Sequence, residues 1–96
     1  MIVVSKHAEQ RMKERLGLNK RSIARIAEKA YMNGIRRKDT KGMLSKWIDG
    51  VYLKNKNANN IRLYGDMLYI FCDNILVTVF QIPTNMRNNI DDFLKK

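Results

Sequence analysis

The alternation of apolar and polar positions predicts two helices at the start of the chain. A short apolar run at 2–4 reads as a first strand, and Ser5 can cap a helix over 6–16. Asn19 can cap a second helix that ends near Gly34. Apolar residues of the second helix recur at i, i+3, i+4, i+7 and i+8, which indicates one buried face; they are Ile23, Ile26, Ala27, Ala30 and Tyr31.

The stretch 35–60 predicts an insertion between these helices and a sheet. Four apolar residues are spaced for a short third helix that Gly50 ends: Met43, Leu44, Trp47 and Ile48. We expect a strand at 51–54 and a polar loop at 55–60.

Three β-rich runs follow, at 61–64, 67–72 and 75–82, separated by two-residue turns. Such turns fix the register, and they place Arg62 opposite Tyr69 and Tyr69 opposite Thr78. One face of this sheet is then entirely apolar and is expected to pack against helices: Ile61, Leu63, Leu68, Ile70, Cys72, Ile75, Val77 and Val79. The other face carries Arg62, Tyr64, Met67, Tyr69, Phe71, Leu76, Thr78 and Phe80.

Together these elements predict one α+β domain over 1–96. Two N-terminal helices pack on a twisted antiparallel sheet of three to five strands, a short third helix lies in the insertion, and a C-terminal helix covers about 84–95. A second hydrophobic core would have too little chain to bury.

Composition narrows the class of protein. The single Cys72 excludes an internal disulfide and offers no zinc-type spacing, so we expect no metal and no cofactor. No apolar run has the length of a membrane helix, and 1–4 lacks the features of a signal peptide. We therefore expect a cytoplasmic protein without membrane contact.

Charge points to a polyanionic partner. The chain has 19 Lys and Arg against 9 Asp and Glu, a formal net charge of +10. Residues 1–56 hold 15 basic and 5 acidic side chains, whereas 57–96 hold 4 of each, so the first half has all the excess. A one-sided basic surface attracts polyanions by counterion release, and charge alone does not distinguish RNA, DNA and an acidic protein. Expected RNA-binding residues on this half are Arg21, Arg25, Lys29, Arg36, Arg37 and Lys38.

The first helix also carries a candidate catalytic stripe. His7, Arg11, Glu14 and Arg15 fall on one side of it at the i, i+4, i+7 and i+8 positions. The helix N-terminus disfavours a protonated imidazole, so His7 would be able to accept a proton as a general base. The arginines would clamp a phosphate. The alternative is that this is the solvent-exposed face of an amphipathic helix, on which a single His has no catalytic role.

The predicted polar sheet face is a second candidate. Arg62, Tyr69 and Thr78 would form one cross-strand row, with Tyr64 diagonal to it. Hydroxyls can position a phosphate, and tyrosines can stack unpaired bases. The alternative to a binding site is a half-exposed sheet face made of common β-forming residues, or a face covered by the C-terminal helix.

The chain resembles small RelE-like proteins in three segments. One is the motif His7-Ala8-x-x-Arg11-Met12-x-x-Arg15 after a short strand, and the others are the later strand 64–71 and Leu76-Val77-Thr78-Val79. These belong to the barnase, EndoU, colicin and RelE group of metal-independent ribonucleases and are frequent on phages and other mobile elements. The resemblance covers about 1–82. It implies His7, Arg11, Arg15, Tyr64 and Thr78 as catalytic residues. The insertion and the few basic residues on the central strands depart from RelE toxins, which favours free RNA or tRNA as substrate.

The sequence thus predicts an RNA-binding protein, with metal-independent, toxin-type cleavage by 2′-hydroxyl attack as its candidate activity. The alternative is a non-catalytic phage or mobile-element inhibitor that binds a nucleic-acid-handling complex through its basic half. A third hypothesis is a protein-interaction module. An antitoxin or another acidic protein is a candidate partner besides RNA.

Overall fold

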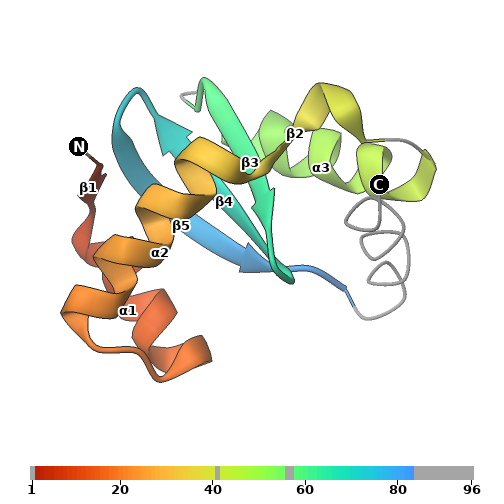
Figure 1. Cartoon of the computed structure of the whole chain (residues 1–96). Coiled ribbons are helices and arrows are strands. Elements are labelled where there is room, and N and C mark those ends of the chain that lie inside the picture. Colours follow the sequence, from red (N-terminus) through yellow and green to blue (C-terminus); the bar gives the residue numbers. More distant parts are fainter. Residues whose placement is uncertain (1, 41, 56–57, 84–96) are drawn as a thin grey trace.

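The computed structural model describes residues 2–40, 42–55 and 58–83, so the predicted C-terminal helix at 84–95 lies outside it. The described residues form an α+β fold, as predicted, with three α-helices and a five-stranded sheet (Figure 1). In chain order the elements are β1 (Val3–Val4), α1 (Lys6–Leu16), α2 (Lys20–Asn33), β2 (Ile35–Arg36), the 3₁₀ helix η1 (Arg37–Asp39), α3 (Gly42–Lys54), β3 (Asn60–Tyr64), β4 (Met67–Cys72) and β5 (Ile75–Gln81).

The sheet is mixed rather than antiparallel. Its strand order is β1-β5-β4-β3-β2. β1 runs parallel to β5, with Val3 opposite Ile75 and Val4 opposite Leu76, while the other neighbours are antiparallel. The prediction of an all-antiparallel sheet was wrong at this edge, because no hairpin joins β1 to β5 and nothing local sets their relative direction.

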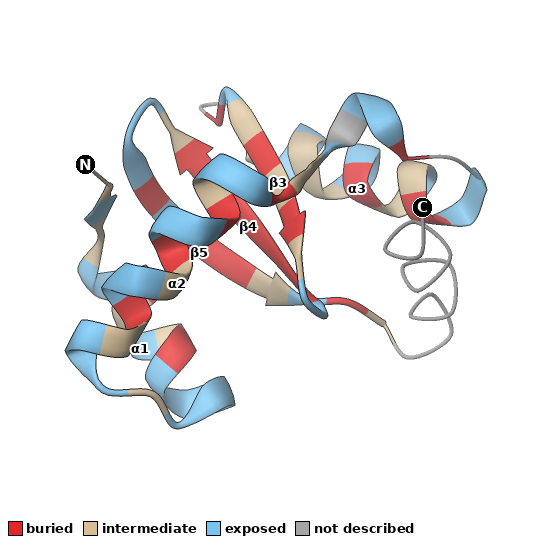
Figure 2. Cartoon of the chain, viewed as in Figure 1, coloured by how far each residue is buried: buried red, intermediate tan, exposed pale blue. Residues whose placement is uncertain are grey.

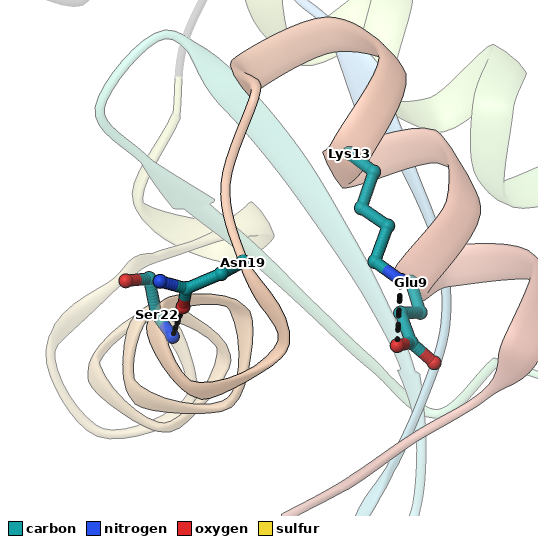
Figure 3. A network of polar contacts seen from close by, with 4 residues as sticks. All are labelled: Glu9, Lys13, Asn19 and Ser22. Carbon is teal, nitrogen blue, oxygen red and sulfur yellow. Dashed lines mark hydrogen bonds and ion pairs between the residues drawn. The ribbon is translucent and has the colours of Figure 1, made fainter.

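The predicted helix caps are confirmed. The side chain of Ser5 accepts a hydrogen bond from the N–H of Ala8 at the start of α1, and Gly17 ends that helix with φ at 63°. Asn19 Oδ1 accepts from the N–H of Ser22 at 2.9 Å (Figure 3). These contacts satisfy N–H groups that a helix start leaves without partners. They explain why both helices begin where the sequence predicted.

Helix α3 is longer than predicted. It continues through Gly50 to Lys54, so the expected strand at 51–54 was wrong. Leu44 and Ile48 are buried, and Val51 and Tyr52 pack beside them. These residues form an i, i+4, i+7, i+8 stripe, whose burial offsets the cost of about 1 kcal/mol for a glycine inside a helix.

The register between β3 and β4 is confirmed, because Arg62 pairs with Tyr69. The register between β4 and β5 agrees with the predicted turn only next to it, where Cys72 pairs with Ile75 and Phe71 with Leu76, and it was predicted wrongly beyond that point. Tyr69 pairs with Val79, and Ile70 pairs with Thr78.

A β-bulge causes this difference. Beyond Ile70 and Thr78 the next pair is Phe71 with Leu76, which leaves Val77 as an extra residue on β5. The extra residue turns Thr78 to the face opposite Tyr69. Val77 is 37% exposed and Thr78 only 5%, the reverse of the predicted exposures.

Helices cover both faces of the sheet. Core residues of α1 and α2 pack against the face that was predicted to be polar: Ala8, Met12, Ile23, Ala27 and Ala30 against Met67, Tyr69, Phe71, Leu76 and Val79. The opposite face packs against α3, through Leu44 and Ile48 against Ile61, Leu63, Leu68, Ile70 and Ile82. Figure 1 shows α2 in front of the sheet, with α1 beside it and α3 apart from both, and Figure 2 shows the buried strands between them. The expected polar face is covered because its central side chains are large and apolar.

Arg62 fastens the end of α2 to the sheet. Its Nη1 donates to the carbonyl of Gly34 at 3.0 Å, and its Nε donates to Asn60 Oδ1 at 3.0 Å. A Cβ at Gly34 would lie 2.5 Å from the carbonyl oxygen of Ala30 and 2.8 Å from Cβ of Arg62. This junction therefore needs glycine because of close packing, since φ at Gly34 is an ordinary −65°.

Candidate functional site

Helix α1 lies along the edge of β5 and runs in the same direction. Ser5 Oγ donates to the carbonyl of Val77 at 2.9 Å, Arg11 Nη1 to that of Val79 at 3.4 Å, and Arg15 Nη1 to Gln81 Oε1 at 3.3 Å. β1 pairs only with the first two residues of β5. Side chains of α1 therefore take the place of a neighbouring strand along the rest of this edge.

The outer side of α1 forms a shallow pocket of about 280 Å³. Its lining residues all come from this helix: His7, Gln10, Arg11, Glu14 and Arg15. The four residues of the predicted stripe thus lie together. Gln10 was missed, although its i+3 spacing from the histidine places it on the same side.

Contacts with β5 hold the two arginines of the α1 pocket. The guanidinium carbon of Arg11 lies 5.4 Å from the centre of the Phe80 ring, a cation–π arrangement that adds to its hydrogen bond with Val79. Arg11 is half-buried, whereas Arg15 is exposed. Each guanidinium has five N–H groups, so one bond to β5 leaves donors for a ligand.

The pocket has a mixed electrostatic character. Glu14 contributes a carboxylate, whose Oε1 accepts a hydrogen bond from Gln10 Nε2 at 3.1 Å. Two arginines against one carboxylate leave a net positive charge. His7 is exposed in the first turn of α1. The pocket therefore places the imidazole of His7 beside two guanidinium groups that can bind an anion.

Thr78 lies apart from this pocket. Its side chain is on the α3 face of the sheet, as its partner Ile70 is, and not on the face that α1 covers. Oγ1 of Thr78 is buried and has no hydrogen-bond partner among the described residues. The structure does not bring the hydroxyl of Thr78 to His7.

The two predicted tyrosines differ in access. Tyr69 is 2% exposed beneath α1 and α2 and is not available for base stacking. Burial, with smaller effects from the carboxylate of Asp66 and from Tyr64, raises the pKa of Tyr69 to about 12. Tyr64 is half-buried, with its ring 6.4 Å from that of Tyr69. It shares a cross-strand row with Gln81, the residue that Arg15 contacts, so it lies toward that end of the α1 pocket.

Most predicted RNA-binding residues are on the surface. The exposed ones are Arg21, Arg25, Lys29, Arg36 and Lys38. In Figure 2 exposed residues of α2, in pale blue, recur along the whole helix between its buried ones. The side chain of Arg37 lies outside the described structure. The guanidinium of Arg62 donates hydrogen bonds to Gly34 and Asn60, which gives this arginine a structural role.

One basic residue of α1 has a local partner. Lys13 lies outside the pocket and pairs with Glu9 at 3.3 Å (Figure 3). The excess positive charge of the helical layer therefore lies mainly on the α1 pocket and on α2.

The described part of the chain contains no helix with both the length and the apolar character needed to cross a membrane. It also has no group of three or more His, Cys, Asp or Glu side chains that could hold a metal ion. Comparison of the chain with protein-family models, with curated proteins and with solved structures finds no match.

Proposed function

We propose that this domain binds RNA through the helical layer of α1 and α2, with phosphates at the α1 pocket. The observation that supports this proposal is the pairing of Arg11 and Arg15 in one pocket, each oriented by a contact with β5. Arginines held in this way lose little side-chain entropy when they bind a phosphate, and their planar forks match its oxygens.

The charge of the first half of the chain supports the same proposal. The exposed Arg21, Arg25 and Lys29 follow one another at i+4 steps on α2. Each contact with a phosphate releases counterions, so affinity is expected to fall steeply with salt. We expect this surface to bind RNA without sequence specificity, because contacts with phosphates carry no information about the bases.

The experiment compares two double variants with equal charge. Arg11→Gln/Arg15→Gln removes the pocket arginines, and Lys46→Gln/Lys54→Gln removes two exposed lysines from α3. We expect the first to weaken binding of single-stranded RNA at least about tenfold, and to lower the salt slope by about 1.4. The α3 variant is expected to stay within about twofold.

Fluorescence anisotropy at several salt concentrations measures both quantities, and circular dichroism checks folding. Arg15→Gln alone serves where the double variant does not fold, because Arg15 is exposed. Equal losses in the two double variants, or no binding by the unmodified protein, would overturn the proposal.

RNA cleavage is a second candidate function, supported by the exposure of His7 in the same pocket as both arginines. In this mechanism His7 takes the proton of a 2′-hydroxyl, whose oxygen attacks the adjacent phosphorus. The bond from phosphorus to the 5′-oxygen breaks, a 2′,3′-cyclic phosphate forms, and the leaving oxygen takes a proton from water. Arg11 and Arg15 stabilise the added negative charge.

This mechanism departs from the role that the RelE-like resemblance implies for Thr78, whose hydroxyl points to the other face of the sheet. Tyr64 is the sheet residue that keeps a supporting role, since it lies toward the Arg15 end of the pocket. If RNA binds but is never cut, the non-catalytic inhibitor that binds a nucleic-acid-handling complex becomes the better hypothesis.

A further inference from the structure

A second pocket lies at the opposite edge of the sheet, where η1, α3 and the start of β3 meet. Its volume is about 270 Å³. It is lined by Arg36, Lys38, Tyr52, Asn59, Asn60 and Ile61. Unlike the α1 pocket, it has no carboxylate among the described residues that line it. We propose that this β2-edge pocket binds one nucleotide of a single-stranded RNA, with the phosphate on Arg36 and Lys38 and the base against Tyr52.

The cations of the pocket have the character of a phosphate site. Arg36 and Lys38 are both exposed and lie two positions apart, on β2 and η1. Neither makes a hydrogen bond or an ion pair with another described residue that would neutralise it. An arginine and a lysine together supply a planar fork and a point charge, a combination suited to a phosphate group.

The remaining lining residues suit a base. Half-buried Tyr52 lines the pocket with an aromatic side chain, and Ile61, 6% exposed, lines it with an apolar one. Bases stack on tyrosine regardless of their identity. The pocket volume falls just below the range of about 300–1,000 Å³ typical of small-molecule sites, so a single nucleotide is the largest unit that it suits.

Two amides on the rim are held in fixed orientations. Asn59 Nδ2 donates to Asp73 Oδ1 at 2.7 Å, and Asn59 Oδ1 accepts from the N–H of Asp73 at 2.8 Å. Asn60 Oδ1 accepts from Arg62 Nε, which leaves Asn60 Nδ2 as a donor. An amide donor can bond an acceptor of a base, such as O4 of uracil or N7 of adenine.

The β2-edge pocket lies next to the proposed RNA-binding layer. RNA as the source of its nucleotide rests on that proposed function. Helix α2 leads from the α1 side of the molecule to β2, so its exposed basic residues lie between the two pockets along the chain (Figure 1). Fourteen residues of helix span about 21 Å, a distance that several nucleotides of one strand can cover. The two pockets would then hold separate parts of the same strand.

The test is titration of the ¹⁵N-labelled protein with uridine 5′-monophosphate, observed by NMR. We expect saturable shifts at the backbone amides of Asn59, Asn60 and Ile61, and at the side-chain amides of the two asparagines. Uridine alone and inorganic phosphate alone are each expected to bind more weakly.

The variant Arg36→Gln/Lys38→Gln is expected to weaken binding of the nucleotide at least about tenfold. Its matched control, Lys46→Gln/Lys54→Gln, loses the same charge from α3 at residues outside the pocket, and it is expected to stay within about twofold. Equal losses in both, shifts spread over the whole basic surface, or equal affinity for phosphate alone would each overturn the nucleotide pocket.

A single-stranded RNA titration separates this inference from the proposed function. RNA binding without nucleotide shifts at the β2-edge pocket refutes the pocket and leaves the proposed function in place. Nucleotide binding at this pocket without RNA binding refutes the proposed function, and also refutes the pocket as a site for a nucleotide of an RNA strand.

Discussion

Ser5 holds both carbonyls at the bulge of β5, because its N–H donates to Leu76 at 3.0 Å and its Oγ donates to Val77 at 2.9 Å. The same Oγ accepts from the N–H of Ala8 and caps α1. A bulge turns successive carbonyls toward one side, where an ordinary strand would alternate them. One serine thus connects the start of α1 with the irregular point of the last described strand.

Replacement of Ser5 by alanine is expected to lower the free energy of unfolding by about 1–2 kcal/mol, because the cap and the contact with Val77 are both lost. Urea denaturation measures the change. Ser22→Ala is the control, since its backbone N–H keeps the bond to Asn19, and it is expected to change stability by less than about 0.5 kcal/mol. Equal effects of the two substitutions would contradict a special role for Ser5.

Replacement of Gly34 by alanine is expected to destabilise the fold by about 1–3 kcal/mol or more, because the new methyl group meets backbone and Arg62. Gly50→Ala is the matched control within α3, where a Cβ meets nothing within 4 Å. That substitution is expected to stabilise the protein by about 0.5–1 kcal/mol through helix propensity. Thermal denaturation of both variants checks the opposite signs.

Thr78→Val is expected to leave stability unchanged or to raise it slightly, because it removes a buried hydroxyl without a partner and keeps the shape of the side chain. The reciprocal substitution Val79→Thr buries a hydroxyl under α1 and α2, and is expected to cost about 1–3 kcal/mol. RNA binding should be unaffected by Thr78→Val. Loss of RNA cleavage in a fully folded Thr78→Val protein would instead restore the catalytic role that the sequence implied.

His7→Ala separates cleavage from binding. If His7 is the general base, cleavage of RNA in metal-free buffer should fall about 10²–10⁴-fold, while affinity changes little. Gln10→Ala, in the same pocket, is the control and should keep most of the rate. A substrate with a 2′-deoxy sugar at the scissile position should not be cut at all. Persistent cleavage of that substrate would exclude the 2′-hydroxyl mechanism.

Local sequence signals predicted the helical layer well. Ser5 and Asn19 cap their helices through contacts three residues away, and the stripe from Ile23 to Tyr31 packs on the sheet. The β3–β4 hairpin was also predictable, because its two-residue turn at Gly65 and Asp66 sets the register and no bulge interrupts it. In each case the determining contacts lie close together along the chain.

The errors came from interactions that are distant in sequence. The bulge at Val77 makes its hydrogen bonds with Ser5, a distant residue that no pattern within 75–82 reveals. One inserted residue reversed the faces beyond it, and it removed Thr78 from the predicted row. Likewise, α3 passes Gly50 because the sheet offers an apolar face for the continuation of its stripe. The α1 pocket was predictable because it belongs to a single helix.

The parallel pairing of β1 with β5 delays assembly of the α1 pocket during protein synthesis. Ser5 and Val77 are 72 residues apart, and the last contact of α1 with β5 is at Gln81. Contacts of such sequence separation form slowly, and a ribosome releases the N-terminal part of a chain first. Arg11 and Arg15 have no strand to orient them while β5 is still inside the ribosome. A nascent chain that still lacks β5 therefore cannot present the oriented pocket to the RNA of the ribosome, and formation of the site awaits synthesis through Gln81.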